Sequence, residues 1–243
     1  MIKRKTAIKI RKTHRYLGLF LGIQFLMWTI SGLYFSWTDL DEIHGDQFHN
    51  TEMNHKLFAN LLSPTAIPNA SEVMSLELLD IADEPYYLLN HTQLVHAQTG
   101  ELKNEISEEE ALKVAKKNMI SGMKVLGIER ITETGKHHEY RGGPLPAYVI
   151  SYDTPENIKA YVSAADGKFK TLRHRDWRWF DFLWMTHTMD YEGRDNFNNI
   201  ILRAFSLLGL ITVLSGFTLW YVSSPTMRKW KKAIKSELKT ESK

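Results

Sequence analysis

His14 is the residue whose surroundings most suggest chemistry. It stands at the start of a long apolar segment, and Gly18 and Gly22 follow it at intervals of four residues. If the segment is helical, the three residues lie on one stripe of its surface. Two glycines beside an imidazole leave room for a flat ring such as a porphyrin, and imidazole is a common axial ligand of haem iron. The pattern fits a close helix–helix contact equally well, with His14 as another basic residue near lipid headgroups.

A second histidine, His187, follows a segment rich in tryptophan and phenylalanine. On a helical wheel, one face carries Trp177, Trp179, Phe180, Leu183, Trp184 and His187, opposite Arg178 and Asp181. Tryptophan is favoured at the level of lipid headgroups, so we expect residues 176–199 to form an interfacial helix and a connector. His187 is either a buried residue with its own hydrogen bonds or a second axial ligand for haem iron.

Few other residues suggest chemistry. Arg203 lies within an apolar segment, where it either holds a haem propionate or extends to the headgroups. His137 and His138 stand in a polar loop, and we expect them at the surface. The chain has no cysteine, which excludes disulfides, cysteine nucleophiles and cysteine-bound zinc. No hydrolase or nucleotide-binding motif is present, so neither a hydrolase nor a nucleotide-driven pump is supported.

Two apolar segments must position these residues. Residues 16–37 contain Gln24 as their one strongly polar side chain, and residues 200–222 contain Arg203 as their one charge. A helix of about 22 residues rises roughly 33 Å, enough to cross a hydrocarbon core of about 30 Å. We therefore predict two transmembrane helices. The first is too long for the apolar part of a signal peptide, and no Ala-x-Ala-like site follows it, so we expect a retained anchor.

Basic residues predict the orientation of these helices. Segments 1–15 and 223–243 are rich in lysine and arginine, whereas acidic residues outnumber basic ones between the helices. Short basic flanks stay in the cytoplasm, and a long loop is translocated largely regardless of its charge. We therefore expect a protein of the bacterial inner membrane with two cytoplasmic tails and a periplasmic domain. The tails contact anionic lipid, and nothing indicates a nucleic-acid partner.

The loop between the spans, residues 38–175, is predicted to fold as an α+β domain. Ser107 and Glu110 form a capping box that begins a helix. Apolar runs between turn signals predict strands near residues 74–79, 86–90, 93–97, 125–132, 147–152 and 160–163. Residues 94–101 resemble residues 161–168, each a strand that runs into a glycine turn. We expect an α/β sandwich of a helix and antiparallel strands that is partly duplicated.

Five short motifs, in their order along the chain, resemble the PepSY-associated transmembrane family. Residues 14–19, His-Arg-Tyr-Leu-Gly-Leu, resemble the opening of the family's first span, and residues 31–33, Ser-Gly-Leu, its close. Residues 184–188, Trp-Met-Thr-His-Thr, are similar to the start of a later span, and residues 215–220, Ser-Gly-Phe-Thr-Leu-Trp, to its end. Residues 105–170 resemble a PepSY domain, with a Ser-x-x-Glu-Ala-x-x-x-Ala pattern and a terminal Asp-Gly turn.

This resemblance implies a cofactor, because some members of the family look like b-type haem proteins that reduce ferric siderophores. His14 and His187 would then be axial ligands to the iron of haem b, with Gly18, Gly22 and Arg203 beside the cofactor. The chain departs from the family pattern in two ways. It has two predicted spans where longer members have more, and Met-Asp replaces a Gly-Arg pair at residues 189–190. A complete, self-sufficient reductase is therefore not expected.

The predicted topology separates the two histidines. His14 lies on the cytoplasmic side and His187 on the outer side of a core about 30 Å thick, so one haem cannot bind both within one chain. All the other histidines follow the first span. The second ligand of a haem at His14 therefore has to come from another copy of the chain across a twofold axis. A haem at His187 has the same option, or His44 or His49.

Two functions remain open. The first is an electron-transfer subunit, a component of a haem-dependent oxidoreductase that serves reduction of ferric iron or its chelates, acting as a homodimer or within a larger membrane complex. The second is a non-enzymatic, membrane-anchored module whose PepSY-like domain binds a peptidase, a peptide or a partner membrane complex.

Overall fold

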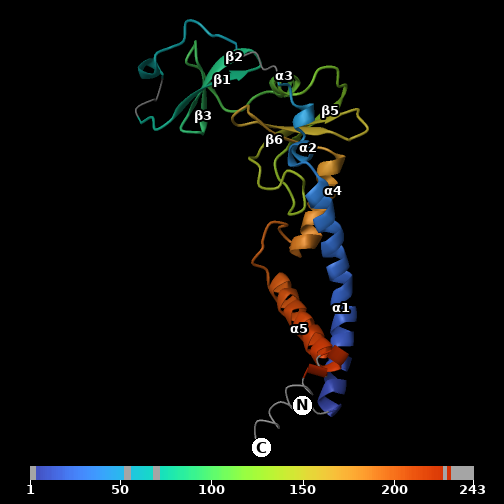
Figure 1. Ribbon diagram of the computed structural model, residues 1–243. Helices are drawn as coiled ribbons and strands as arrows, with labels where there is room; N and C mark the ends of the chain where they lie inside the picture. The colour runs from blue at the N-terminus through green and yellow to red at the C-terminus, as the bar shows by residue number, and fades with distance from the viewer. Residues whose placement is uncertain (1–3, 52–55, 68–71, 227–228, 231–243) are drawn as a thin grey trace, which may run out of the picture. The chain divides into compact units, whose positions relative to one another are not determined.

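The computed structural model describes residues 4–51, 56–67, 72–226 and 229–230. They belong to two compact units. The membrane unit contains the helices α1 (Arg4–Trp37) and α5 (Ile200–Ser223), together with the end of α4 (Arg175–Thr188) from Leu183 onward. The domain unit runs from Thr38 to Phe182 and contains all the strands (Figure 1).

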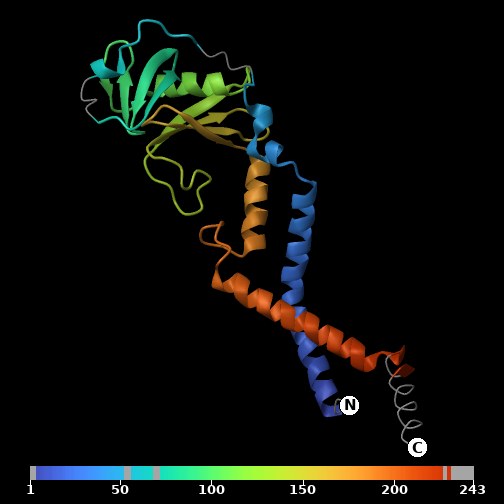
Figure 2. The same cartoon turned by 60° about the vertical axis from the view of Figure 1, so that its left-hand side comes forward.

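The structure confirms the two predicted transmembrane helices. Both are long and apolar enough to cross a membrane, over Lys5–Trp37 in α1 and Ile200–Ser223 in α5. They pack against each other, and Figure 2 shows α5 crossing α1. The Phe20 and Phe205 rings stack at the contact, with 5.6 Å between their centroids.

The basic N-terminal segment is helical where the structure describes it. α1 is helical from Arg4, so residues 4–15 extend the same helix beyond the predicted span. Lysine and arginine are good helix formers, and these residues include no glycine or proline that would end the helix. His14 therefore stands on a continuous helix rather than at a helix start.

The first sheet of the domain unit is an antiparallel meander. Two short 3-10 helices, η1 (Asp46–Phe48) and η2 (Pro64–Ala66), precede it along the chain. Its strands, in spatial order, are β1 (Leu76–Ile81), β2 (Glu84–Leu89), β3 (Gln93–His96) and β4 (Leu102–Lys103). The first three confirm predicted strands within two residues, and β4 was not predicted.

The second sheet repeats this order after a helix. The helix is α3 (Glu108–Asn118), and the strands are β5 (Val125–Ile131), β6 (Ala147–Tyr152), β7 (Lys159–Ser163) and β8 (Phe169–Arg173). All pairs are antiparallel. The first three strands confirm predictions, β6 with both of its boundaries, whereas β8 was not predicted. α3 packs against β6, β7 and β8 and also against β1 (Figure 2).

One apolar core joins both sheets and the helix. Leu88 of β2, Ala111 and Ala115 of α3, and Ile150 and Val162 of the second sheet are all buried in it. Because side chains alternate between the faces of a strand, the neighbouring residues of β2 and β6 point the other way and form two smaller clusters. The predicted α+β fold of a helix with antiparallel strands is confirmed.

The two similar segments of the sequence occupy equivalent places in the two sheets. Residues 94–101 include β3, and residues 161–168 include β7, each the third strand of its meander. Both strands run into a glycine with a positive φ, +78° at Gly100 and +64° at Gly167. Glycine adopts this left-handed backbone without a steric penalty, which explains its presence in both turns.

A short segment before the first sheet is built into the domain core. α2 (Leu40–His44) is followed by Gly45, which has a φ of +89°. A Cβ atom at Gly45 would lie 2.3 Å from Cδ1 of Leu172, so only glycine allows this approach. The buried Ile43 presents its carbonyl oxygen to Nε2 of His174 at 3.0 Å. These contacts fix the chain that leads into the domain.

Replacing Ser107 by alanine should destabilise the domain by about 1 kcal/mol. Ser107 and Glu110 form the predicted capping box: the Ser107 hydroxyl accepts from the Glu110 amide at 3.2 Å, and the Glu110 carboxylate accepts from the Ser107 amide at 2.7 Å. Urea unfolding of the full chain in detergent, followed by circular dichroism, measures the loss. The exposed Ser121→Ala is the control, and an equal loss in both variants would contradict the role of the cap.

Candidate functional site

His14 of α1 contacts α5 through a serine. Its Nδ1 lies 2.7 Å from Oγ of Ser215, and the same hydroxyl donates to the carbonyl oxygen of Thr212 at 2.7 Å. A hydroxyl has one hydrogen to donate, so Ser215 accepts from His14 rather than donating to it. In the neutral form of the imidazole the hydrogen is therefore on Nδ1, and Nε2 keeps its lone pair.

His187 of α4 has the same arrangement with α1. Its Nδ1 lies 2.8 Å from Oγ of Ser31, and that hydroxyl donates to the carbonyl oxygen of Met27 at 2.7 Å. Ser31 is fully buried, so its one hydrogen is committed to this carbonyl. The hydrogen of the His187 imidazole is again on Nδ1, which leaves Nε2 as the free acceptor.

Both histidines thus present a ring nitrogen that suits a metal ion. A histidine that binds a metal usually donates its other ring N–H to a fixed acceptor, which orients the ring and raises its basicity. Each acceptor serine is followed by a glycine, Gly32 in α1 and Gly216 in α5. A Cβ atom at Gly216 would lie 3.3 Å from Cε1 of His14, so the glycine lets the ring lie close to α5.

The end of α4 is held by three aromatic or polar side chains of α1. The His187 ring lies edge-on to Phe35, with 5.6 Å between centroids, and 6.2 Å from Trp28. The Trp28 indole N–H donates to the His187 carbonyl at 2.7 Å, and the Gln24 amide donates to the Thr186 carbonyl at 3.2 Å. The bond from the Gln24 amide nitrogen explains how a span tolerates this residue, because a polar donor in an apolar segment needs an acceptor.

The residues that depart from the family pattern form the connection from α4 to α5. Met189 has a φ of +53°, a conformation that suits the glycine of that pattern, and its side chain is buried. The Asp190 carboxylate accepts from the backbone amides of Asn196 and Gly193, which lowers the pKa of Asp190. Asn199 then caps α5 and donates to the Thr188 carbonyl at 3.0 Å. Met189 and Asp190 therefore shape the turn after His187.

The other predicted site residues have fewer contacts. A Cβ atom at Gly18 or Gly22 would meet no atom within 4 Å, so this stripe faces open space instead of a helix of the same chain. The glycines that let α1 and α5 approach closely are on α5, Gly209 beside the Phe25 ring and Gly216 beside His14. Arg203 is exposed on α5, and its side chain forms no hydrogen bond or ion pair within the described residues.

The two histidine sites lie at different levels of α1. His14 and Ser31 are 17 positions apart on this continuous helix, which corresponds to roughly 25 Å of rise at about 1.5 Å per residue. Because the His187 ring is hydrogen-bonded to Ser31, it lies at the level of Ser31 on α1. The two imidazoles therefore occupy separate sites. The sequence-based expectation that they are not ligands of one metal ion within one chain agrees with this spacing.

Comparison with known families decides the classification. The family model of the PepSY-associated TM region matches residues 2–223 of the chain. The chain belongs to the PepSY-associated TM family. No curated protein and no solved structure matches it. The match includes both transmembrane helices of this PepSY-associated TM protein and all four residues of its histidine–serine pairs.

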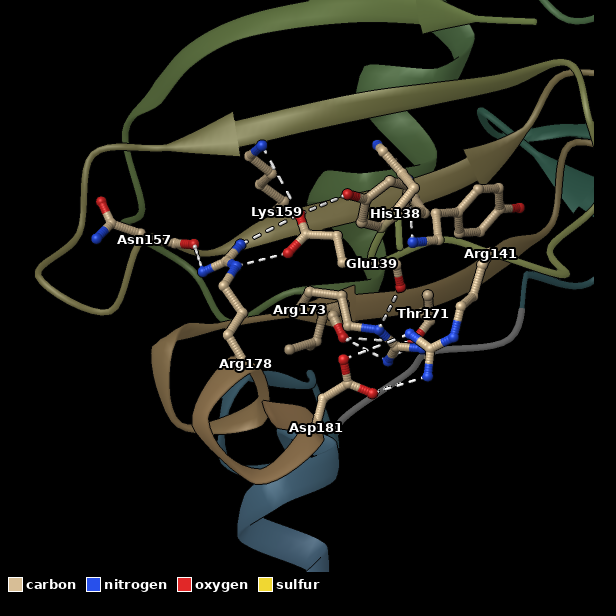
Figure 3. A network of polar contacts seen from close by, with 12 residues as sticks. His138, Glu139, Arg141, Asn157, Lys159, Thr171, Arg173, Arg178 and Asp181 are labelled. Carbon is tan, nitrogen blue, oxygen red and sulfur yellow. Dashed lines mark hydrogen bonds and ion pairs between the residues drawn. The ribbon is translucent and has the colours of Figure 1, made fainter. Parts of the chain in front are cut away.

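A network of charged residues forms the second polar centre of this PepSY-associated TM protein, within the domain unit (Figure 3). Glu139, in the loop between β5 and β6, accepts from Nε of Arg178 at 2.5 Å and from the Tyr161 hydroxyl at 2.7 Å. Its backbone carbonyl accepts from Nε of Arg173 at 3.1 Å. Nζ of Lys159 lies 3.7 Å from the carboxylate. Glu139 is thus the shared acceptor of the network.

The same network includes polar side chains from the start of α4. Asp181 is only 5% exposed and binds Arg141 at 2.7 Å, whereas Trp179 is 57% exposed. The guanidinium of Arg173 lies 4.1 Å above the Trp177 ring. The exposed Trp179 and the paired Asp181 are compatible with the predicted interfacial helix, whose placement at a membrane surface stays a prediction. The burial of these two carboxylates is tolerated because each one binds an arginine, Asp181 with Arg141 and Glu139 with Arg178.

The stability of the domain should fall in acid, with Glu139 as one cause. Burial raises the pKa of Glu139, but hydrogen bonds from Arg178 and Tyr161 outweigh it and hold the pKa below its ordinary value of 4.5. A depressed pKa in the folded state stabilises the fold above the unfolded pKa, and this stabilisation is lost as the pH falls through the folded pKa. Urea unfolding between pH 7 and pH 3 should therefore show a smaller advantage of the wild type over Glu139→Gln at the acidic end. A constant difference would contradict this linkage.

Ser31, Ser215 and Glu139 are the residues that sequence reasoning did not assign to a site. The two serines stand in recognisable Ser-Gly pairs near the ends of the spans, which is the signal that was available for them. Glu139 follows His137 and His138 in a loop interpreted as surface. His137 is exposed as expected, but His138 is half-buried, and its Nδ1 accepts from the Tyr140 amide at 3.1 Å.

Proposed function

We propose that this protein is a b-type haem-binding electron-transfer subunit in the membrane, with His14 and His187 as axial ligands. One observation carries the proposal: each histidine donates Nδ1–H to a serine whose own hydrogen is committed to a backbone carbonyl. This arrangement fixes the tautomer that leaves Nε2 free for iron. A histidine that only reinforced helix packing would not need the same serine partner at both positions.

A haem supplies a metal centre that gains and loses one electron without leaving the protein. Two further features of the membrane unit fit this cofactor. The open stripe at Gly18 and Gly22, one and two turns after His14, gives a flat ring access to α1. Arg203 is the one basic residue of the second span and is available for a propionate.

The charge pattern supports a path across the membrane. The basic flanks keep both ends of the chain in the cytoplasm, so His14 is near the cytoplasmic face and His187 near the outer face of a bacterial inner membrane. The PepSY-like domain is then periplasmic. Two haems at these levels would connect a cytoplasmic donor to an acceptor outside the membrane, and the family resemblance favours ferric iron or its chelates as that acceptor.

Each site needs a second axial ligand. No second described histidine lies in the membrane unit beside His14 or His187, because the others that are described all belong to the domain unit. The simplest source is another copy of the chain, so a homodimer pairs His14 with His14 and His187 with His187 across a twofold axis. A partner within a larger membrane complex would supply the same imidazoles.

A visible absorption spectrum of the detergent-purified full-length protein tests the proposal. The protein should be expressed with ample haem and measured oxidised and after dithionite reduction. Sharp, split α and β bands with close to one haem per chain would support a dimer with two paired sites. A featureless spectrum would overturn the proposal and leave the two histidines as structural residues.

A second candidate is a non-enzymatic module that binds a peptidase, a peptide or a partner complex. The observation that favours it is β5, an edge strand of the second sheet whose side chains are mostly exposed, Leu126 by 63%. An exposed strand edge accepts an added strand from a partner. Co-purification of a peptide or protein with colourless material, lost when Leu126 is replaced by lysine, would support this function instead.

A further inference from the structure

The domain unit contains a cavity that neither candidate function uses. It lies between the second half of α3, the loop that follows it and the start of β5, and it measures about 680 Å³. Its apolar lining comes from Leu112, Met119, Met123 and Val125. Sites for small organic ligands have volumes of about 300–1,000 Å³ and mostly apolar walls. A cavity of this size exceeds what one inserted side chain would fill, and methionine adapts to ligands of different shape.

Tyr152 supplies a hydroxyl without a described protein partner to this cavity. Its side chain lines the cavity and is only 5% exposed. Among the described residues, the Tyr152 hydroxyl has no protein hydrogen-bond partner, and the oxygen is not fully enclosed, so a molecule in the cavity can reach it. Burial raises the pKa of Tyr152 to about 12, so the group keeps its hydrogen at neutral pH and can donate it. A ligand oxygen would satisfy it.

Two lysines supply positive charge. Lys113 and Lys116 line the cavity, are exposed, and stand three positions apart on α3, hence on one helix face. Neither forms an ion pair within the part of the chain that the structure describes. Other lysines of the domain do so, for example Lys103 with Glu110 and Lys117 with Asp80. The unpaired lysines therefore complement an anion.

We propose that this cavity binds an amphipathic carboxylate with a second oxygen acceptor in its apolar part. The carboxylate pairs with Lys113 and Lys116, the apolar body occupies the space between the methionines and Val125, and the second oxygen accepts from the Tyr152 hydroxyl. Such a small molecule would occupy the domain independently of haem in the membrane unit.

Three related compounds test the proposal on the full-length protein in nanodiscs. The first, 4-oxo-4-phenylbutanoate, carries the carboxylate, the ring and a ketone. The second, 4-phenylbutanoate, lacks the ketone, and the third, 4-oxo-4-phenylbutanamide, lacks the charge. Saturation-transfer NMR, corrected with empty nanodiscs, gives the affinity of each. The keto acid should bind several-fold more tightly than either of the other two compounds.

Variants then assign each contact. Tyr152→Phe should weaken the keto acid about three- to tenfold and leave 4-phenylbutanoate unchanged, because only the ketone uses the hydroxyl. Lys113→Gln with Lys116→Gln should weaken both acids by a similar factor and leave the amide unchanged. Lys124→Gln, an exposed lysine that does not line the cavity, is the matched charge control.

Three binding results would overturn the proposal, and a blocking variant supplies a fourth. They are no binding of the keto acid at millimolar concentration, equal binding of acid and amide, or an equal loss of all three compounds in Tyr152→Phe. The third would mean that the substitution disturbs the domain rather than one hydrogen bond. Ser121→Phe, which places a ring at the cavity wall without changing charge, should abolish binding of every compound, and unchanged binding in this variant would place the ligand elsewhere.

Discussion

His14→Ala and His187→Ala are each expected to remove about half of the haem bound per chain, and the double variant all of it. The reason is that the two histidines occupy separate levels of α1, each with its own serine. Alanine offers no ligand to iron, and a bis-histidine site without one axial imidazole loses its low-spin spectrum. Pyridine haemochrome analysis and reduced-minus-oxidised spectra of the purified variants measure both effects.

Replacing the two serines tests how much their hydrogen bonds to His14 and His187 contribute to haem binding. Ser31→Ala and Ser215→Ala remove the acceptor of Nδ1–H but keep the imidazole, so each should weaken haem binding at its own site by about 10- to 100-fold. His91→Ala, at an exposed turn between β2 and β3, is the matched control and should retain full haem content. Full haem content in both His14→Ala and His187→Ala would show that neither residue is a ligand.

Local sequence patterns predicted much of the domain. Ser107 and Glu110 located the start of α3 because capping depends on residues three positions apart, and the apolar run of β6 was long enough to define both ends. β4 has only two residues, and β8 reads Phe-Lys-Thr-Leu-Arg, without a regular alternation of apolar and polar side chains. These two strands are strands because they pair with β3 and β7. Pairing with another segment cannot be predicted from the local sequence.

The candidate site was predictable only in part for the same reason. His14 and His187 stand out by residue type and by position near a span, but their partners do not. Ser215 is 201 positions from His14, and Ser31 is 156 positions from His187. Which serine meets which histidine depends on how α1 packs with α4 and α5. The tautomer, and hence the free Nε2, becomes visible only with that packing.

Glu139→Gln is expected to destabilise the domain by about 2 kcal/mol, because it removes the charged acceptor that the half-buried Arg178 and the Tyr161 hydroxyl share. Glu139 is the shared acceptor for Arg178 and Tyr161, and its side chain is only 14% exposed. Glutamine keeps the size but removes the charge, so Arg178 keeps at most a neutral partner. Urea unfolding of the full chain in detergent at pH 7, followed by the loss of β-sheet circular dichroism, measures the change.

The same substitution at an exposed pair provides the control. Glu105 accepts two hydrogen bonds from Arg130, but both side chains are 40% exposed, so Glu105→Gln should cost less than about 1 kcal/mol. In the double variant Glu139→Gln with Arg178→Gln, the loss should be smaller than the sum of the single losses, because removing the second charge relieves the imbalance left by the first. Additive losses would mean that the carboxylate and the guanidinium act independently. The attraction between the charges of Glu139 and Arg178 would then add no stability of its own. The start of α4 would be held in the domain by uncharged hydrogen bonds and packing.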